Sequence, residues 1–316
     1  MAEKVYNSAL YRFAVTTTWF TVLLLIVGAM VTSNQAGDSV PDWPLAYHKL
    51  IPPLVGGVRF EYSHRVVAGI VAIMTFFLAI WIAAADRRRQ VRRLGWNALA
   101  LVIAQAILGG MRVLDRDPGT LATLHAILAQ LFFIVLVSLA LFLSPWWQRD
   151  LPVLEDKGTP RAVTVTGWTT FVIFVQLILG ACFRHGVLGI MPHLAGACVV
   201  TVFVVWSGRV VRKRFRSVRE LRRGSALLHS AFGIQILLGI TTYWGIQYVH
   251  DSTNPTLLYD TLTVSHVLFG ALTLASSLLL ALSCYRMTPH AKATAAASDS
   301  VSLPQHAADA SGKAGA

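Results

Sequence analysis

Eight apolar runs, each close to the length that crosses a bilayer, most constrain how this sequence can fold. A transmembrane helix needs about 20 predominantly apolar residues. Only helices and closed β-barrels cross a bilayer, because both satisfy all of their backbone polar groups internally. Of the 316 residues, 55% are hydrophobic and only 13% are charged, which excludes an ordinary soluble globular protein. We expect membrane-spanning helices at 13–32, 64–85, 95–111, 121–143, 163–183, 193–207, 225–244 and 262–284.

Basic residues between these runs predict the orientation. The linker 86–95 carries five arginines, and the linker 209–223 carries eight lysines and arginines. Cytoplasmic loops of membrane proteins have an excess of Lys and Arg, so both linkers and both termini are expected on the cytoplasmic side of the cell (inner) membrane. The net charge of +12 then reflects this orientation. It predicts that the basic linkers contact lipid headgroups, and it does not indicate a nucleic-acid partner.

Short motifs recur in register and indicate an internal repeat. The third, fifth and seventh runs carry QAILG at 105–109, QLILG at 176–180 and QILLG at 235–239, whereas the first carries LLIVG at 24–28 without the glutamine. This pattern predicts an all-α protein built as two pseudo-symmetric four-helix bundles of parallel topology. The expected parts are an N-terminal bundle (1–144), a cytoplasmic linker (145–162), a C-terminal bundle (163–287) and a disordered tail (288–316).

A histidine near the start of every even-numbered run is the second repeated feature. In the predicted orientation these runs all cross from outside to inside, so the four histidines lie at similar depth. Two imidazoles from facing helices can ligate a heme iron, and a small residue one turn deeper leaves room for the porphyrin. A single interfacial histidine is more often a polar anchor, but the fourfold recurrence favours heme ligation. The candidate iron ligands are His64, His125, His193 and His266, followed one turn later by Ala68, Ala129, Ala197 and Gly270.

An acidic residue distinguishes the two halves. Glu61 precedes His64 by one helical turn, whereas an isoleucine stands at the corresponding place before His193. A carboxylate near the hydrocarbon is costly, which suggests a general base or a charge stabiliser beside a heme. An interfacial pair with Arg59 or Arg65 would also explain it. On the first hypothesis the N-terminal bundle is the reaction site, and the C-terminal bundle holds a permanent heme.

The loop between the first two runs, residues 34–53, is long and contains Gly and Pro turn signals. Together with Trp43 these signals predict a structured cap over the mouth of a bundle, although Trp also prefers the membrane interface as an anchor. His48, His185 and His250 lie in outer loops and are expected to be surface residues that could help to cover a cofactor.

These motifs together resemble the heme A synthase family. The likeness covers residues 10–285 and rests on GAMVTSNQAGDSVPDWPLAYHKLIPP at 28–53, EYSHR at 61–65 and the later histidines. The combination of the DWP loop, the ExxHR motif and paired histidines is specific. The resemblance implies a membrane enzyme that oxidises a ring methyl group of heme O to the formyl group of heme A, through hydroxymethyl stages, for use by terminal oxidases.

The resemblance also assigns roles to the candidate residues. It implies that the N-terminal bundle takes the substrate, heme O, through His64 and His125, that the C-terminal bundle holds heme b through His193 and His266, and that Glu61 is catalytic. A heme O synthase that supplies the substrate is a sensible partner, and oligomer formation stays open.

In one respect the sequence departs from the family. Many members carry two cysteines that flank the DWP segment, and Val40 and Ala46 stand at those places here. A redox role for such a pair cannot operate in this chain.

Two other function classes compete with the enzyme. A di-heme b-type electron carrier would fit the matched histidine sets but not the one-sided Glu61. A transporter built from parallel repeats would need charges at mid-membrane, which are absent from the runs. The enzyme is favoured, and it requires lipid-accessible gaps in the first bundle through which a heme can exchange.

Overall fold

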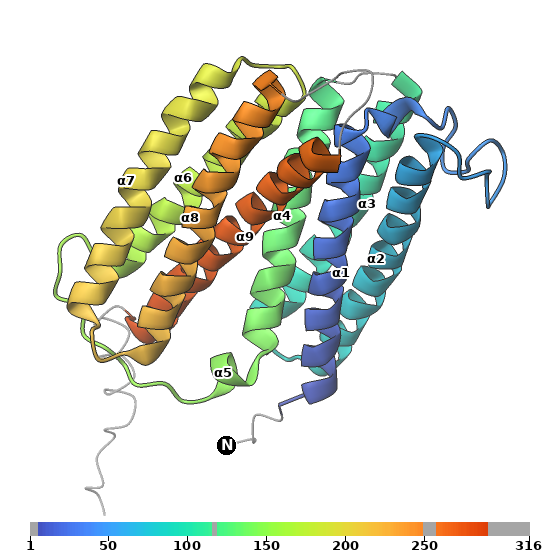
Figure 1. The fold of residues 1–316 in the computed structure, drawn as a ribbon. Helices are drawn as coiled ribbons and strands as arrows, with labels where there is room; N and C mark the ends of the chain where they lie inside the picture. Colours follow the sequence, from blue (N-terminus) through green and yellow to red (C-terminus); the bar gives the residue numbers. More distant parts are fainter. Residues whose placement is uncertain (1–5, 116–118, 249–256, 290–316) are drawn as a thin grey trace, which may run out of the picture.

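A computed structural model describes residues 6–115, 119–248 and 257–289 of the chain. Eight helices in this part are long and apolar enough to cross a membrane, and Figure 1 shows them side by side. They confirm the expected all-α, multi-pass membrane class. The long helices are α1 (Ser8–Ser33), α2 (Val58–Ala85), α3 (Arg89–Asp115), α4 (Thr120–Leu143), α6 (Ala162–Arg184), α7 (Ile190–Arg214), α8 (Arg219–Tyr248) and α9 (Leu257–Met287); the short ones are η1 (Ala36–Asp38) and α5 (Pro145–Gln148).

Side-chain capping explains where α1 and α5 begin. The side chain of Asn7 accepts a hydrogen bond of 3.0 Å from the N–H of Leu10 and so caps α1. Ser144 caps α5 in the same way through the N–H of Trp147 at 3.1 Å, and Pro145 at the first helical position suits a helix start. The expected linker 145–162 therefore opens with one short helix.

The helices pack in two groups of four. In the first group α1 contacts α2 and α4, and α3 contacts α2 and α4; in the second, α6 contacts α7 and α9, and α8 contacts α7 and α9. The groups meet mainly along α9, which also packs against α1 and α4. Buried Phe133 and Val137 of α4 form one apolar cluster with Ala271 and Ala275 of α9, and this cluster joins the two groups.

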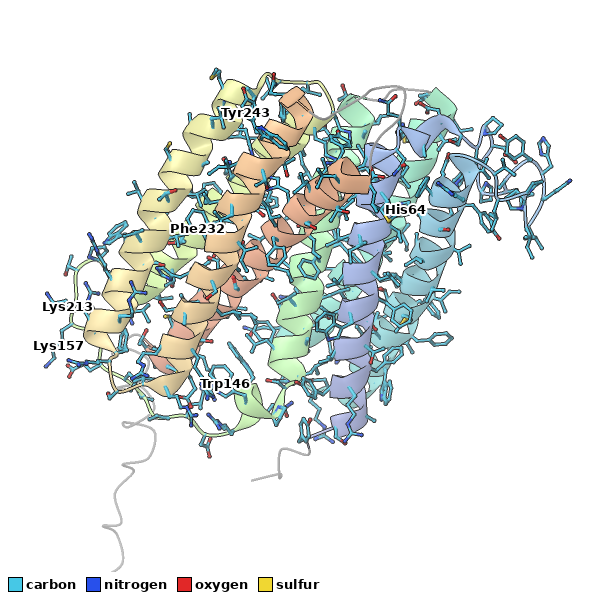
Figure 2. All side chains as sticks on the ribbon, in the orientation of Figure 1. His64, Trp146, Lys157, Lys213, Phe232 and Tyr243 are labelled. Carbon is cyan, nitrogen blue, oxygen red and sulfur yellow. The ribbon has the colours of Figure 1, made fainter. Side chains whose placement is uncertain are left out.

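All four predicted histidines lie toward the end of the molecule at which α2, α4, α7 and α9 begin; we name it the histidine end. Figure 2 shows His64 in the upper half of the view, whereas Lys157 and Lys213 lie at the opposite end.

Polar contacts join the two groups at the histidine end. The Ser33 and Thr263 hydroxyls are hydrogen-bonded at 2.8 Å. Arg184 at the end of α6 donates to the Ser33 hydroxyl at 2.8 Å and to a backbone carbonyl of α1 at 3.0 Å. Asn34 donates to the Asp260 carboxylate at 3.2 Å.

Beyond α9 the described chain continues to residue 289 and packs against the start of α6. The hydroxyl of Thr288 donates to a carbonyl of α9 at 2.8 Å, and Arg161 donates to the Thr288 carbonyl. The expected disordered tail otherwise falls on residues 290–316, which lie outside the described residues.

Candidate functional site

The four predicted histidines form two matched pairs. The ring centroids of His64 on α2 and His125 on α4 are 6.4 Å apart, with an interplanar angle of 73°. The centroids of His193 on α7 and His266 on α9 are 6.3 Å apart, with an angle of 85°. Each pair comes from two helices of the same group of four, so the fold brings together the residues that the repeat suggested.

The spacing of each pair fits one metal ion between two imidazoles. Two metal–nitrogen bonds of about 2 Å each, with the offset from each ring nitrogen to its centroid, account for a separation of this size. Among the described residues no group of three or more His, Cys, Asp or Glu side chains could hold a metal ion. The protein therefore offers two ligands per site, which fits a heme iron because the porphyrin supplies the remaining nitrogens.

Each of these imidazoles lies against a glycine on the preceding helix. The glycines are the last residues of the LLIVG, QAILG, QLILG and QILLG motifs. A methyl carbon added at any of them would crowd the ring, so glycine is what allows the helix to approach the imidazole this closely. The distances from such a carbon to the ring Cε1 would be 3.0 Å for Gly28 and His64, 3.2 Å for Gly109 and His125, 3.0 Å for Gly180 and His193, and 3.1 Å for Gly239 and His266.

The glutamines of the same motifs contact the same histidines. The sequence revealed their repetition but not their role. Each lies one turn before the glycine, and its amide nitrogen points at the histidine of the next long helix. The contacts run from Gln105 to the His125 carbonyl (2.9 Å), from Gln176 to the His193 carbonyl (2.8 Å) and Nδ1 (3.1 Å), and from Gln235 to the Nε2 of His266 (3.4 Å).

Glu61 lies in the first turn of α2, one turn before His64, and is only 4% exposed. One carboxylate oxygen forms an ion pair of 2.6 Å with Arg65, and the other accepts the N–H of Val40 at 2.9 Å. Of the two arginines considered from the sequence, Arg65 is therefore the partner, whereas Arg59 stacks over a neighbouring aromatic ring. These contacts compensate for burial of the charge and fix the carboxylate near one histidine pair only.

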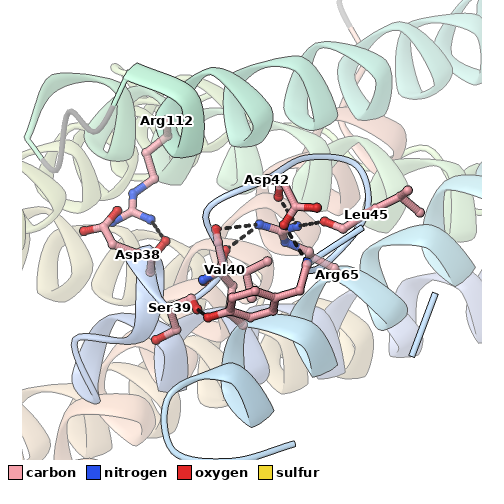
Figure 3. A network of polar contacts seen from close by, with 10 residues as sticks. Asp38, Ser39, Val40, Asp42, Leu45, Arg65 and Arg112 are labelled. Carbon is pink, nitrogen blue, oxygen red and sulfur yellow. Dashed lines mark hydrogen bonds and ion pairs between the residues drawn. The ribbon is translucent and has the colours of Figure 1, made fainter. Parts of the chain in front are cut away.

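The loop before α2, which we call the cap and define as residues 34–57, is bonded to the start of α2 beside this pair. Arg65 donates to the backbone carbonyls of Asp42 and Leu45 at 2.7 Å each, as Figure 3 shows. The Asp42 carboxylate in turn accepts the N–H groups of Tyr47 at 2.7 Å and His48 at 2.8 Å. These bonds, the one from His48 first, lower the pKa of Asp42. The cap is thus held from α2 and also by its own side chains.

A second arginine fixes the cap from α3. Arg112 donates to the carbonyl of Gly37 and pairs with Asp38 at 3.5 Å. The ring of Trp43 lies against α3, since a methyl carbon added at Gly110 would come within 2.9 Å of it. Gly110 follows the glycine that touches His125, so the cap and the histidine pair share one turn of α3.

An open apolar groove of about 600 Å³ runs between α2 and α3. Trp43 of the cap lines it, together with Phe76 and Phe77 of α2 and Ile103 and Ile107 of α3. All five side chains are well exposed. The groove opens between two helices of the first group, and its lining contains neither His64 nor His125.

His185, expected to be a surface residue, is half-buried where α6 ends. Burial, followed by the charges of Arg184 and Arg112, lowers its pKa to about 4. His125 of the first group also acts on it electrostatically. Sequence reasoning missed this position because only the packing of α6 beside the first group buries it.

Comparison with known proteins agrees with these features. Residues 58–192 match the family model described as cytochrome oxidase assembly protein. A heme A synthase from Symbiobacterium thermophilum is 32% identical over 262 residues, which cover 73% of this chain and 84% of that protein. Heme A synthases from Lysinibacillus sphaericus and an Exiguobacterium species are 30% and 35% identical, over 57% and 52% of this chain. These two alignments span only 59% and 54% of the relatives' own lengths. From the long alignment, the chain belongs to the heme A synthase family.

Proposed function

We propose that this protein is a heme A synthase, which oxidises a ring methyl group of heme O to the formyl group of heme A for terminal oxidases. The observation that carries the proposal is the asymmetry between two matched histidine pairs. Among the residues that the structure describes, only the pair on α2 and α4 has a fully buried carboxylate one helical turn before one of its histidines. The matched histidine pairs would also suit a di-heme electron carrier, but a carboxylate buried beside one pair alone has no role in simple electron transfer.

The two pairs would hold different hemes. We assign heme O, the substrate, to His64 and His125, and a resident heme b to His193 and His266. Heme b supplies one-electron redox chemistry when bound. Converting a methyl to a formyl group passes two electron pairs in succession to an external oxidant and introduces one oxygen atom from water or dioxygen, with a hydroxymethyl group as the intermediate stage. The histidines of the first pair orient the porphyrin so that one methyl group is presented for this reaction.

Glu61 would be the catalytic residue. Its carboxylate is fixed by Arg65 and by the N–H of Val40, so it needs little reorganisation when charge develops beside it. In this position it stabilises positive charge on the bound substrate or accepts a proton from water next to the ring. The cap, which is bonded to Arg65 and Arg112, would limit the access of bulk water to Glu61 and so strengthen such electrostatic interactions.

The groove between α2 and α3 would let an apolar heme move between the bilayer and the first site. Its lining is apolar and faces outward, so a substrate dissolved in lipid can approach without crossing water. A heme O synthase in the same membrane is the sensible donor.

We also infer that the protein lies in the cytoplasmic membrane with both termini on the cytoplasmic side. The basic linkers 86–95 and 209–223 support this orientation through the excess of Lys and Arg that cytoplasmic loops carry. The histidine end would then face outward.

A heme analysis tests the function directly. The full chain is expressed in a host that makes heme O but no heme A, and total heme is identified by chromatography and mass spectrometry. We expect a formyl-bearing heme or its hydroxymethyl precursor. Glu61→Gln should leave only heme O while the heme b content stays unchanged. Glu220→Gln, which removes a carboxylate from an exposed ion pair with Arg149, is the matched control and should behave like the wild type.

Two results would contradict the proposal. Unchanged heme O, with heme b bound at both sites, would indicate an electron carrier. Normal product from Glu61→Gln would remove the catalytic role of this residue while leaving the enzyme assignment intact.

A further inference from the structure

The glutamine contacts have one exception, and it falls on the proposed substrate site. Leu24 occupies the place on α1 that a glutamine occupies on α3, α6 and α8, one turn before Gly28, which touches His64. Leu24 packs against the apolar core of the first group. The Nδ1 atoms of His64, His125 and His266 are all buried without a hydrogen-bond partner, so the difference at His64 is the missing glutamine. His64 is therefore the one histidine of the four that no glutamine contacts.

Contacts to the imidazole rings themselves occur only in the second pair. Gln176 reaches a ring nitrogen of His193, and Gln235 reaches a ring nitrogen of His266. In the first pair Gln105 reaches only the backbone carbonyl of its histidine. A ligating imidazole is oriented by the group that accepts its other ring N–H, and losing that acceptor typically lowers metal affinity roughly 10- to 100-fold. The side-chain oxygens of Gln176 and Gln235 are buried without a partner, and turning either amide over brings its oxygen to the ring as this acceptor.

The neighbouring residues match this difference. A methyl carbon added at Gly196 would lie 2.0 Å from the side-chain oxygen of Gln176, and one at Gly270 would lie 3.3 Å from the amide nitrogen of Gln235. Glycine on α7 and α9 thus makes room for each amide. On α2, Val67 packs against the same apolar core as Leu24. The α1–α2 contact is built for a hydrocarbon side chain.

We propose that residue 24 determines whether the first site exchanges its heme. Leu24 leaves His64 without an amide contact, so His64 can swing away from the iron and release it. The glutamines of α6 and α8 position both rings of the second pair, so that site retains heme b. Leu24 is in this sense a positioning residue, and its assignment to heme O release rests on the proposed function.

The test measures heme loss from each site of the full-length protein in lipid nanodiscs. Protein loaded with heme O and heme b is mixed with excess apomyoglobin, and the heme that leaves is identified by chromatography. Leu24→Gln should slow the loss of heme O roughly 10- to 100-fold, and Gln176→Leu should speed the loss of heme b by a similar factor. Leu23→Gln, on an exposed position of α1, is the control and should change neither rate.

A second readout separates positioning from general destabilisation. The low-spin electron paramagnetic resonance signal of heme b reports the orientation of its axial imidazoles, so it should shift in Gln176→Leu while the melting temperature stays close to that of the wild type. An unchanged signal together with an unchanged rate of heme b loss would overturn the role of the glutamines. An unchanged rate of heme O loss in a folded Leu24→Gln protein would overturn the role of residue 24.

The outcomes also distinguish this inference from the proposed function. If Leu24→Gln does not fold, the double variant Leu24→Gln/Val67→Gly makes room for the amide and repeats the measurement. The measurement of heme b loss requires no catalytic turnover, so its result does not depend on whether the protein makes heme A. A chain that binds heme O and makes no heme A would refute the synthase activity, and the exchange rates would still decide the part played by Leu24.

Discussion

Replacing Arg65 with methionine should open the cap without unfolding the rest of the protein. The Arg65 side chain is 15% exposed, and its guanidinium pairs with Glu61 at 2.6 Å and donates to the carbonyls of Asp42 and Leu45. Methionine keeps an apolar stem but leaves the Glu61 charge, whose side chain is 5% exposed, without its partner. Removing one partner of a buried pair costs about 3–5 kcal/mol.

This free energy should appear as local opening, because the contacts of Arg65 lie within the cap and the start of α2. At about 1.4 kcal/mol for each factor of ten, a cost of about 3 kcal/mol makes the open state more than a hundredfold more populated. The backbone amides of Val40, Tyr47 and His48 report it directly, since each donates to a carboxylate in the closed cap.

Hydrogen exchange read by mass spectrometry on the full chain in nanodiscs measures this opening. Exchange within 34–57 should rise about a hundredfold in Arg65→Met, whereas peptides from α6 to α9 should stay unchanged. Arg59→Met removes a nearby exposed arginine and should have no effect. Glu61→Gln combined with Arg65→Met should open the cap less than Arg65→Met alone, because no unpaired charge remains. Exchange at the wild-type rate in Arg65→Met would refute the idea that this ion pair closes the cap.

Three further predictions concern the second site and pH. Gly180→Ala should lower heme b affinity roughly tenfold, because the added methyl group would lie 3.0 Å from the His193 ring and overpacking costs about 1–3 kcal/mol. Gly167→Ala is the control and should not lower the affinity, because nothing lies within 4 Å of its added methyl group. Equal heme b content in both variants would refute the close packing of Gly180 against His193. His193→Ala should abolish the low-spin heme b spectrum, and an unchanged spectrum would exclude it as a ligand. The free energy of unfolding should fall by on the order of 2 kcal/mol as the pH drops from about 6.5 toward about 4. The pKa of His185 lies near 4 in the folded protein, so over this pH range the unfolded chain binds the proton and the folded chain does not. His185→Gln should flatten this decline in melting temperature, and an unaltered pH profile would show that another group causes it.

The existence of the eight long helices could be predicted because apolar length alone identifies a membrane span. Their ends could not. The third helix was expected from residue 95, whereas α3 begins at Arg89, and the sixth was expected to end at residue 207, whereas α7 continues to Arg214. The additional turns carry arginines and lysines, which hydropathy excludes from a span although they are good helix formers.

The sequence predicts which residues of the site share one end of the molecule, but it does not predict which atoms are in contact. Recurrence placed four histidines at one depth, but spacing along one helix cannot tell which atoms of the next helix a glutamine will reach. The partner of Glu61 was left open between Arg59 and Arg65, although only Arg65 stands four residues away, where helical side chains meet. That choice could have been made from the sequence.

The cap shows how a loop without a disulfide is fixed. Val40 and Ala46, which stand where many family members carry cysteines, are 0% and 2% exposed, and all three cysteines of the chain are free and lie elsewhere. Arg65 and Arg112 hold the same loop from two helices. Neither arginine could be assigned to the loop beforehand, because each contacts backbone carbonyls, for which the sequence carries no signal.

The position of α9 has a consequence for how the protein is made. α9 packs against α1, α4, α6 and α8, yet it is the last of the eight spans to leave the ribosome. His64 and His125 are both synthesised before residue 144, so the first histidine pair can form during translation, whereas His193 must wait for His266. Most of the packing between the two groups forms only after α9 has inserted, and a chain arrested before residue 257 would contain one complete histidine pair of the two.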